Sequence, residues 1–204
     1  MKLYGMPNTR SIRVSWALEE TDIDYQFHLI NLRNGEGNSA EFRQVNPGGK
    51  IPVLDDNGFK LTESLAICNY IARKAPQKNL MPFDDIKQLA LHDQWSVFAM
   101  CELETPLWTR SRHTFVYPET FRVPEILDTT QREFGEACAV LEKGLGSKPY
   151  ILGDQFQMAD ILLVQCLIWA QAIDLPVSDL LTAYKTRATQ RPAFQRALSK
   201  EGSL

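Results

Sequence analysis

The hydrophobic pattern changes period twice within the first part of the chain. Residues 2–5 form a short apolar run that stops at a Pro-Asn turn signal, and residues 11–20 then repeat apolar side chains at helical spacing. Residues 25–30 return to strict alternation, which is typical of a half-buried strand. A strand–helix–strand unit favours a parallel pair of strands with a right-handed crossover. The polar residues 33–40, which include two glycines, are predicted to be loop.

A second pattern predicts a hairpin and another helix. The runs 51–54 and 59–61 flank Asp55-Asp56-Asn57-Gly58, and an Asn-Gly step favours the tight turn of a β-hairpin. Residues 63–72 carry apolar side chains on one helical face. Together these elements predict an α/β domain over residues 1–75, with a mixed four-stranded sheet and helices packed on it.

Helical spacing dominates the rest of the chain. The polar stretch 76–84 contains two prolines and is predicted to be a linker, followed by an all-helical domain over residues 85–204. The predicted helices are 85–110, 125–145, 158–172, 180–189 and 192–198. Residues 158–172 are almost entirely apolar, which predicts a central, buried helix.

Composition excludes several classes of function. A net charge of -3 opposes a nucleic-acid or anionic lipid partner. The sequence has no signal-peptide core and no stretch of about 18 apolar residues, so we expect a cytoplasmic protein without a membrane partner. The cysteines lack metal or redox spacing and His is scarce, so no metal site is expected. Cys68 and Cys166 stand among apolar residues and are predicted to be buried thiols.

Four segments, in their order and spacing, resemble the cytosolic glutathione S-transferase family in its bacterial type. They are residues 8–20, 46–54, 62–71 and 156–160, with Arg-Pro-Ala-Phe at 191–194 closing the chain. The resemblance implies a thioredoxin-like first domain, a helical bundle as the second, a homodimer and a role in detoxification. It also implies glutathione as co-substrate, no other cofactor, and a small hydrophobic electrophile as the second substrate.

Ile51-Pro52, within Asn-Pro-Gly-Gly-Lys-Ile-Pro, resembles the family's loop for the peptide part of glutathione. The resemblance implies a cis bond before Pro52 and a pairing of the Ile51 backbone with the cysteinyl unit. A cis bond is tolerated before proline, and it leaves backbone donors and acceptors outside a ladder. The alternative is a proline that only ends an edge strand. Lys50 is a candidate partner for the glycyl carboxylate, or else a solvated surface lysine.

Glu63 and Ser64 stand where a strand passes into a helix. A helix N-terminus has free amides and a partial positive charge, so this one can receive the γ-glutamyl carboxylate of glutathione. Ser64 adds a hydroxyl donor, and Glu63 can accept from the ammonium group. The alternative is a plain N-cap at Thr62 with an acid in the first turn, and the two interpretations are compatible.

The segment Asn8-Thr9-Arg10-Ser11 is the candidate for activating the thiol of glutathione. A free thiol has a pKa near ~8.5, and lowering it by about two units needs about 2.7 kcal/mol of preference for the anion. A hydroxyl and the start of a helix can supply this preference. The resemblance places a Tyr, Ser, Cys or Asn here, and we rank Ser11 first, then Thr9, then Asn8. For Ser11 and Thr9 the alternative is a simple helix cap, and Arg10 occupies the position of the cysteine in the bacterial type.

Aromatic and basic residues alternate near the end of the predicted helix 85–110. They are Trp108, Phe115 and Tyr117, interleaved with Arg110, Arg112 and His113. Such a wall suits an apolar, partly anionic electrophile held between the domains. Core packing is the alternative for Trp108, and the net charge opposes single-stranded nucleic acid. Further on, Asp160 resembles the family's folding signature at the start of the buried helix, where its loss should cost 1–2 kcal/mol, roughly the value of a lost cap.

The preferred hypothesis is therefore a transferase that binds glutathione, stabilises its thiolate and conjugates it to a hydrophobic electrophile. Two alternatives remain. One is a glutathione-dependent peroxidase or disulfide reductase, which would use the same site. The other is a non-catalytic protein of transferase-like fold with a binding or regulatory role, because a fold does not guarantee an activity.

Overall fold

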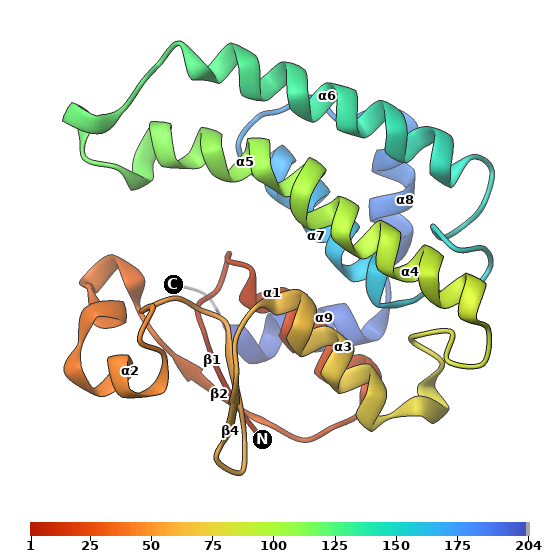
Figure 1. The fold of residues 1–204 in the computed structure, drawn as a ribbon, viewed down its shortest axis with the longest axis horizontal. Coiled ribbons are helices and arrows are strands. Elements are labelled where there is room, and N and C mark those ends of the chain that lie inside the picture. The colour runs from red at the N-terminus through yellow and green to blue at the C-terminus, as the bar shows by residue number, and fades with distance from the viewer. Residues whose placement is uncertain (203–204) are drawn as a thin grey trace. The chain divides into compact units, whose positions relative to one another are not determined.

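The computed structural model describes residues 1–202 of the 204-residue chain, and it divides into two compact units (Figure 1). The first unit contains residues 1–81 together with the segment that begins at Thr189. The second unit contains residues 82–188.

The first unit is built on a four-stranded mixed sheet in the order β2-β1-β3-β4, which confirms the predicted sheet. The strands are β1 Lys2–Gly5, β2 Gln26–Leu29, β3 Val53–Asp56 and β4 Phe59–Leu61. β1 runs parallel to β2 and antiparallel to β3, and β3 is antiparallel to β4. Asn57 and Gly58 in the β3–β4 turn have φ values of 55° and 94°. Positive φ at both central residues is what favours an Asn-Gly sequence there.

Helices pack on this sheet and on one another. They are α1 Ser11–Thr21, α2 Ala40–Val45, α3 Ser64–Lys74 and α9 Pro192–Glu201, with short helical turns at Leu32–Asn34, Glu36–Asn38 and Pro76–Lys78. α1 contacts both α3 and α9. Its residues Val14, Trp16 and Leu18 are fully buried and form the centre of this unit's core. Cys68 on α3 is buried as predicted, and burial raises the pKa of its thiol to about 12.

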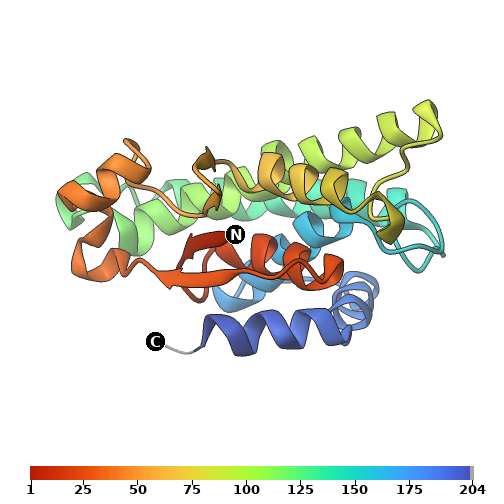
Figure 2. The same ribbon diagram turned by 90° about the horizontal axis from the view of Figure 1, so that it is seen from below.

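The last helix belongs to the first unit, although its sequence resembles the helical half of the chain. Figure 2 shows α9, in dark blue, alongside the red α1. The rings of Trp16 and Phe194 have centroids 4.6 Å apart, and Arg191 donates two hydrogen bonds to the carboxylate of Glu20. Hydrophobic period alone identifies α9 as a helix, but it does not say which core the helix covers.

The prediction of a loop over residues 33–40 is wrong in part. Two short helical turns occupy residues 32–38, and α2 begins at Ala40. Ser39 caps α2 by accepting a hydrogen bond from the backbone N–H of Phe42 at 3.1 Å. Phe42 is the single buried side chain of this helix. A six-residue helix with one anchor is too short to produce a periodic pattern.

The second unit is helical throughout its regular structure. Its main helices are α4 Ile86–Phe98, α5 Glu104–Ser111, α6 Ile126–Leu145, α7 Met158–Ala172 and α8 Asp179–Thr189. α7 is buried along most of its length, as predicted, and so is its thiol Cys166. None of the helices within residues 1–202 is long and apolar enough to cross a membrane.

The predicted helix 85–110 is interrupted by a π-helical turn at Ala99–Leu103, and a second such turn, Arg112–Val116, follows α5. Pro106 explains the first interruption. It lacks the N–H that would bond to the carbonyl of Glu102, and its ring crowds that carbonyl in a regular α-helix. A π-turn just before the proline relieves both conflicts.

Asp160 ties together the start of α7, the preceding loop and α8. Its carboxylate is fully buried and accepts hydrogen bonds from the backbone N–H of Gln157 at 2.8 Å and of Ile151 at 2.9 Å. The hydroxyl of Tyr184 donates a third at 2.5 Å. The predicted bond back to the helix start is confirmed, and the other two bonds extend the role of Asp160 beyond a cap.

Candidate functional site

Two of the predicted segments meet at one end of the sheet because β1 and β3 are antiparallel. β1 ends at Gly5 and leads into residues 6–10, while β3 begins at Val53, which pairs with Tyr4. The end of β1 and the beginning of β3 therefore lie at the same end of the sheet. This places Ile51-Pro52, just before β3, next to the turn that opens α1.

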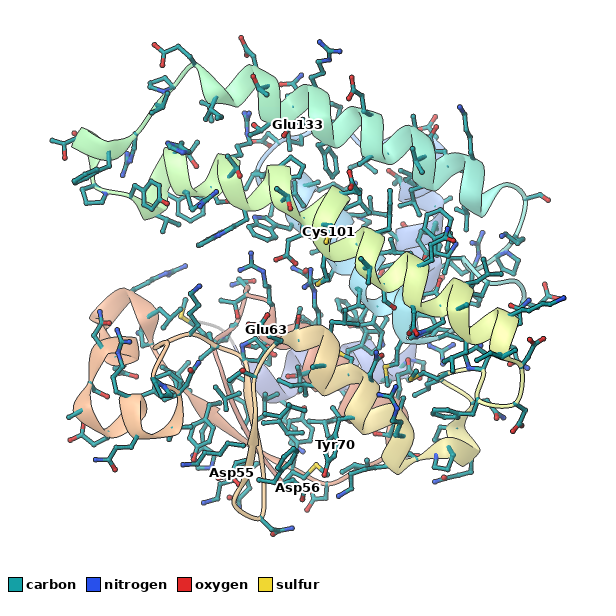
Figure 3. All side chains as sticks on the ribbon, viewed as in Figure 1. Asp55, Asp56, Glu63, Tyr70, Cys101 and Glu133 are labelled. Carbon is teal, nitrogen blue, oxygen red and sulfur yellow. The ribbon has the colours of Figure 1, made fainter. Side chains whose placement is uncertain are left out.

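A buried arginine brings the third segment to the same end. Arg13 on α1 is fully buried, and its Nη1 donates a hydrogen bond to Ser64 Oγ at 3.1 Å. Ser64 is the first residue of α3 and is 5% exposed. Since Arg13 lies only two residues after the start of α1, this bond joins the N-terminal ends of both helices. Figure 3 shows Glu63 at that end of α3.

The Ile51–Pro52 peptide bond is cis, as the resemblance implies. Ile51 lies before the first β1–β3 pair, so its N–H and C=O stand outside the ladder. The side chain of Asn46 holds the preceding loop by donating to the carbonyl of Lys50 at 2.7 Å and accepting from the amide of Gly48 at 2.9 Å. The Lys50 side chain is exposed. The loop thus presents an unpaired backbone edge with a cation beside it.

The start of α3 has the features of an anion site. Glu63 is its N-cap residue, and no side chain caps the helix. The alternative of an N-cap at Thr62 is therefore wrong. Glu63 has φ 66° and ψ 111°, an unfavourable backbone conformation for a residue with a side chain. Backbone strain of this kind is concentrated at ligand-binding positions. In this conformation Glu63 has an exposed carboxylate beside the uncapped amides of α3.

The hydroxyl of Ser11 is used inside the protein. Ser11 is fully buried, and its Oγ accepts from the backbone N–H of Met6 at 3.2 Å and lies 3.0 Å from Thr9 Oγ1. It packs against Gly5, where a Cβ would lie 2.7 Å from its Oγ. This burial reverses the order that the sequence suggests, because Ser11 supports the turn and does not face solvent.

Thr9 and Asn8 are nearer to the surface of the same turn. Thr9 is half-buried, and its hydroxyl donates to the carbonyl of Met6 at 2.7 Å. Asn8 is exposed with a φ of 61°, a left-handed conformation that Asn adopts more readily than most residues. Within residues 1–81 its side-chain amide forms no hydrogen bond, so it is a donor available to a ligand.

Tyr4 and Trp108 both pack against other aromatic rings. Tyr4 is half-buried with its ring against His28 and Phe42, at centroid distances of 5.3 Å and 6.0 Å, which agrees with a structural role. Trp108, on α5 in the second unit, is half-buried and its ring centroid lies 6.4 Å from that of Trp169.

Sequence reasoning missed Arg13. A signal was present, because Arg13 stands between Ile12 and Val14 in a helix whose residues 11–18 are all buried. A charge in such a position needs a partner, since burying an unpaired guanidinium is costly. The hydroxyl of Ser64, at the start of the predicted helix 63–72, was a candidate for that partner.

Comparison with known proteins identifies the family of the chain. The N-terminal domain of glutathione S-transferases matches residues 1–73, and the C-terminal domain of the same family matches residues 124–197. Glutathione S-transferase hmp2 from Hypomyces subiculosus is 31% identical over 79% of this chain and 78% of its own length. Glutathione S-transferase GstA from Escherichia coli O157:H7 is 29% identical over 99% of both chains.

A solved structure extends the likeness to the whole fold. The ternary complex of BphK, a bacterial glutathione S-transferase, superposes with a TM-score of 0.89 and 29% identity, covering 100% of each chain. In this chain, strained Glu63, uncapped α3 and the cis bond at Pro52 occur together at one end of the sheet. On these findings, the chain belongs to the glutathione S-transferase family.

Proposed function

We propose that this protein catalyses the conjugation of glutathione to a small hydrophobic electrophile, with the glutathione held at the end of the sheet described above. The observation that carries the proposal is the bond between Arg13 and Ser64. It fixes the N-terminus of α3 beside the turn 6–10 and the Ile51-Pro52 loop. A tripeptide can then contact all three segments at once.

Each part of glutathione has a chemically matched partner in this arrangement. The γ-glutamyl carboxylate binds at the start of α3, where Ser64 Oγ and the uncapped amides donate to it. The exposed carboxylate of Glu63 accepts from the neighbouring ammonium group. The cysteinyl unit pairs with the backbone of Ile51. The exposed side chain of the adjacent Lys50 is the proposed partner of the glycyl carboxylate.

The sulfur of glutathione then faces Asn8 and Thr9 at the opening of α1. Asn8 supplies a side-chain N–H donor, and Ser11 acts indirectly by holding Thr9. Donors aimed at the sulfur favour the thiolate over the thiol and so lower the thiol's pKa. The thiolate attacks an electrophilic carbon and forms a C–S bond. In a substitution the leaving group departs with its bonding electrons, and in an addition the substrate takes up a proton from solvent.

We also propose that the protein acts as a homodimer in the cytoplasm and serves in detoxification, as the family resemblance implies. Exposed apolar side chains on α4, which include Ile86 at 77% and Val97 at 51% exposure, support an association through this helix. Light scattering during gel filtration tests this proposal. Twice the monomer mass is expected, and a monomer at micromolar concentration would contradict it.

Turnover assays distinguish the proposed function from its alternatives. We expect the protein to be retained on immobilised glutathione and to conjugate 1-chloro-2,4-dinitrobenzene. Activity confined to cumene hydroperoxide or to a mixed disulfide would favour the peroxidase or reductase alternative. Failure to bind glutathione at all would leave only the non-catalytic alternative.

A further inference from the structure

The end of α5 and the π-turn after it hold a cation between two aromatic rings. The guanidinium carbon of Arg112 lies 5.8 Å from the ring centroid of Trp108 and 5.8 Å from that of Tyr117. Its Nη2 donates to Thr109 Oγ1 at 3.0 Å, and its Nη1 donates to the hydroxyl of Tyr117 at 3.4 Å. Neutral groups of one continuous segment therefore fix the position of the guanidinium.

No negative charge within the second unit balances this cation. Among residues 82–188, no carboxylate forms an ion pair with Arg112. Its Nε is buried and has no hydrogen-bond partner in the part of the chain that the structure describes. Elsewhere the protein pairs arginines with carboxylates, as half-buried Arg191 pairs with Glu20 and exposed Arg196 with Glu19. A half-buried guanidinium with only neutral partners retains donors for an anion.

The other two basic residues of the segment bond to the backbone of a later part of the chain. Nη1 of Arg110 donates to the carbonyl of Leu127 at 3.1 Å, and Nδ1 of His113 accepts from the amide of Val123 at 3.1 Å. Of the three cationic or imidazole side chains that the sequence places among these aromatics, Arg112 is the one whose guanidinium lies 5.8 Å from the rings of both Trp108 and Tyr117. Its planar fork matches a carboxylate, while the flanking rings match an aromatic body.

We infer that Arg112 recognises the carboxylate of an aromatic acid, so that arenes bearing an anionic group are the preferred electrophiles. That the aromatic acid reacts as an electrophile rests on the proposed function. Its binding at Arg112 does not require glutathione. Arg112 is then the residue that determines specificity for the charge of the second substrate.

A matched pair of substrates tests this assignment. 4-Chloro-3,5-dinitrobenzoate and its methyl ester share the reacting carbon and differ in one negative charge. We expect Arg112→Gln to lower the ratio of kcat/KM for the acid to that for the ester by about tenfold or more, and Arg112→Lys to give an intermediate ratio. Arg132→Gln is the control, because Arg132 is an exposed arginine of the same unit that pairs with Glu136. An unchanged ratio in Arg112→Gln would overturn the inference.

A binding measurement without glutathione separates this inference from the transferase activity. Calorimetry with the unreactive 3,5-dinitrobenzoate and its methyl ester should show that the wild-type protein prefers the acid, and that Arg112→Gln loses the preference. Binding of the acid should also weaken with added salt, and binding of the ester should not. This result without any turnover would refute the proposed function and leave the inference standing. Equal binding of acid and ester by the wild-type protein would refute the inference alone.

Discussion

Replacing Ser64 by Ala removes the proposed anchor for the glutamyl carboxylate together with the hydrogen bond that joins the start of α3 to Arg13. Ser64 Oγ accepts from Nη1 of Arg13 at 3.1 Å, so its own proton points away from the guanidinium and is available to a carboxylate oxygen. Ser64 is the first residue of α3, and Ala is at least as favourable as Ser within a helix. The substitution therefore deletes the proposed hydrogen bond to the ligand's carboxylate, and it also removes the acceptor of the bond from Arg13 Nη1. Ser64→Thr keeps that acceptor and so separates the two effects.

The size of the effect follows from the burial of that oxygen. A hydrogen bond to a charged group contributes about 1.5–3 kcal/mol. Because Ser64 is 5% exposed, little water can replace the lost hydroxyl, and we expect a loss of about 2–3 kcal/mol in glutathione binding. This corresponds to a rise in Kd of roughly 30- to 150-fold.

Isothermal titration calorimetry with glutathione and with S-methylglutathione measures this change. Both ligands should weaken equally, because the substitution lies at the carboxylate end and not at the sulfur. Ser64→Thr keeps a hydroxyl and should retain most of the affinity. Ser15→Ala is the control for losing a buried hydroxyl in the same unit, since Ser15 bonds to Glu201 and not to the proposed ligand. A folded Ser64→Ala protein whose Kd stays within about twofold of wild type would refute the reasoning.

Three further predictions concern the thiol, the helical unit and α9. Asn8→Asp keeps a residue that tolerates the left-handed backbone but places a carboxylate beside the sulfur. It should raise the pKa of bound glutathione by about 0.5–1 unit in a thiolate absorbance titration, whereas Asn8→Gly should raise it less. Asp160→Ala leaves three donors unpaired and should lower the free energy of unfolding by about 3–5 kcal/mol in urea, so a loss near 1 kcal/mol would contradict the buried network. Burial raises the pKa of Glu201 from 4.5 to about 7, partly offset by the hydrogen bond from Ser15. The folded state therefore keeps a proton that the unfolded state has lost, and this stabilising contribution is complete below about pH 4.5 and disappears as the pH rises through about 7. Between about pH 4.5 and 7 the free energy of unfolding of the wild-type protein should fall by about 3 kcal/mol because of Glu201, and Glu201→Gln should abolish this part of the fall. Identical plots of unfolding free energy against pH for variant and wild type would show that Glu201 is not the group responsible.

Local patterns were sufficient for most of the first unit's architecture. The Asn57-Gly58 turn was predictable because its two positive φ values suit few other residue pairs. The parallel β1–β2 pair followed from the strand–helix–strand order, because a helical crossover joins parallel strands. The π-turn before Pro106 was not predictable from hydrophobic period, because the apolar side chains keep helical spacing on both sides of it.

The candidate site, too, was predictable only in part. Ile51-Pro52 and Glu63-Ser64 were found because their residue types and spacing resemble a known family. The sequence ranks Ser11 first, but the structure buries its side chain, because sequence cannot tell which hydroxyl of a turn points inward. That depends on the space left by Gly5 on a neighbouring strand. Arg13 was missed for a related reason, since its partner Ser64 lies 51 residues away along the chain.

A crystal structure of the protein grown with glutathione tests the central claim most directly. The account predicts the glutamyl carboxylate within about 3.2 Å of Ser64 Oγ, the cysteinyl amide or carbonyl paired with the Ile51 backbone at a similar distance, and the sulfur facing Asn8 and Thr9. Glutathione bound at any other place on the protein, or a clear map at saturating glutathione with water alone along Ile51 and Ser64, would contradict it.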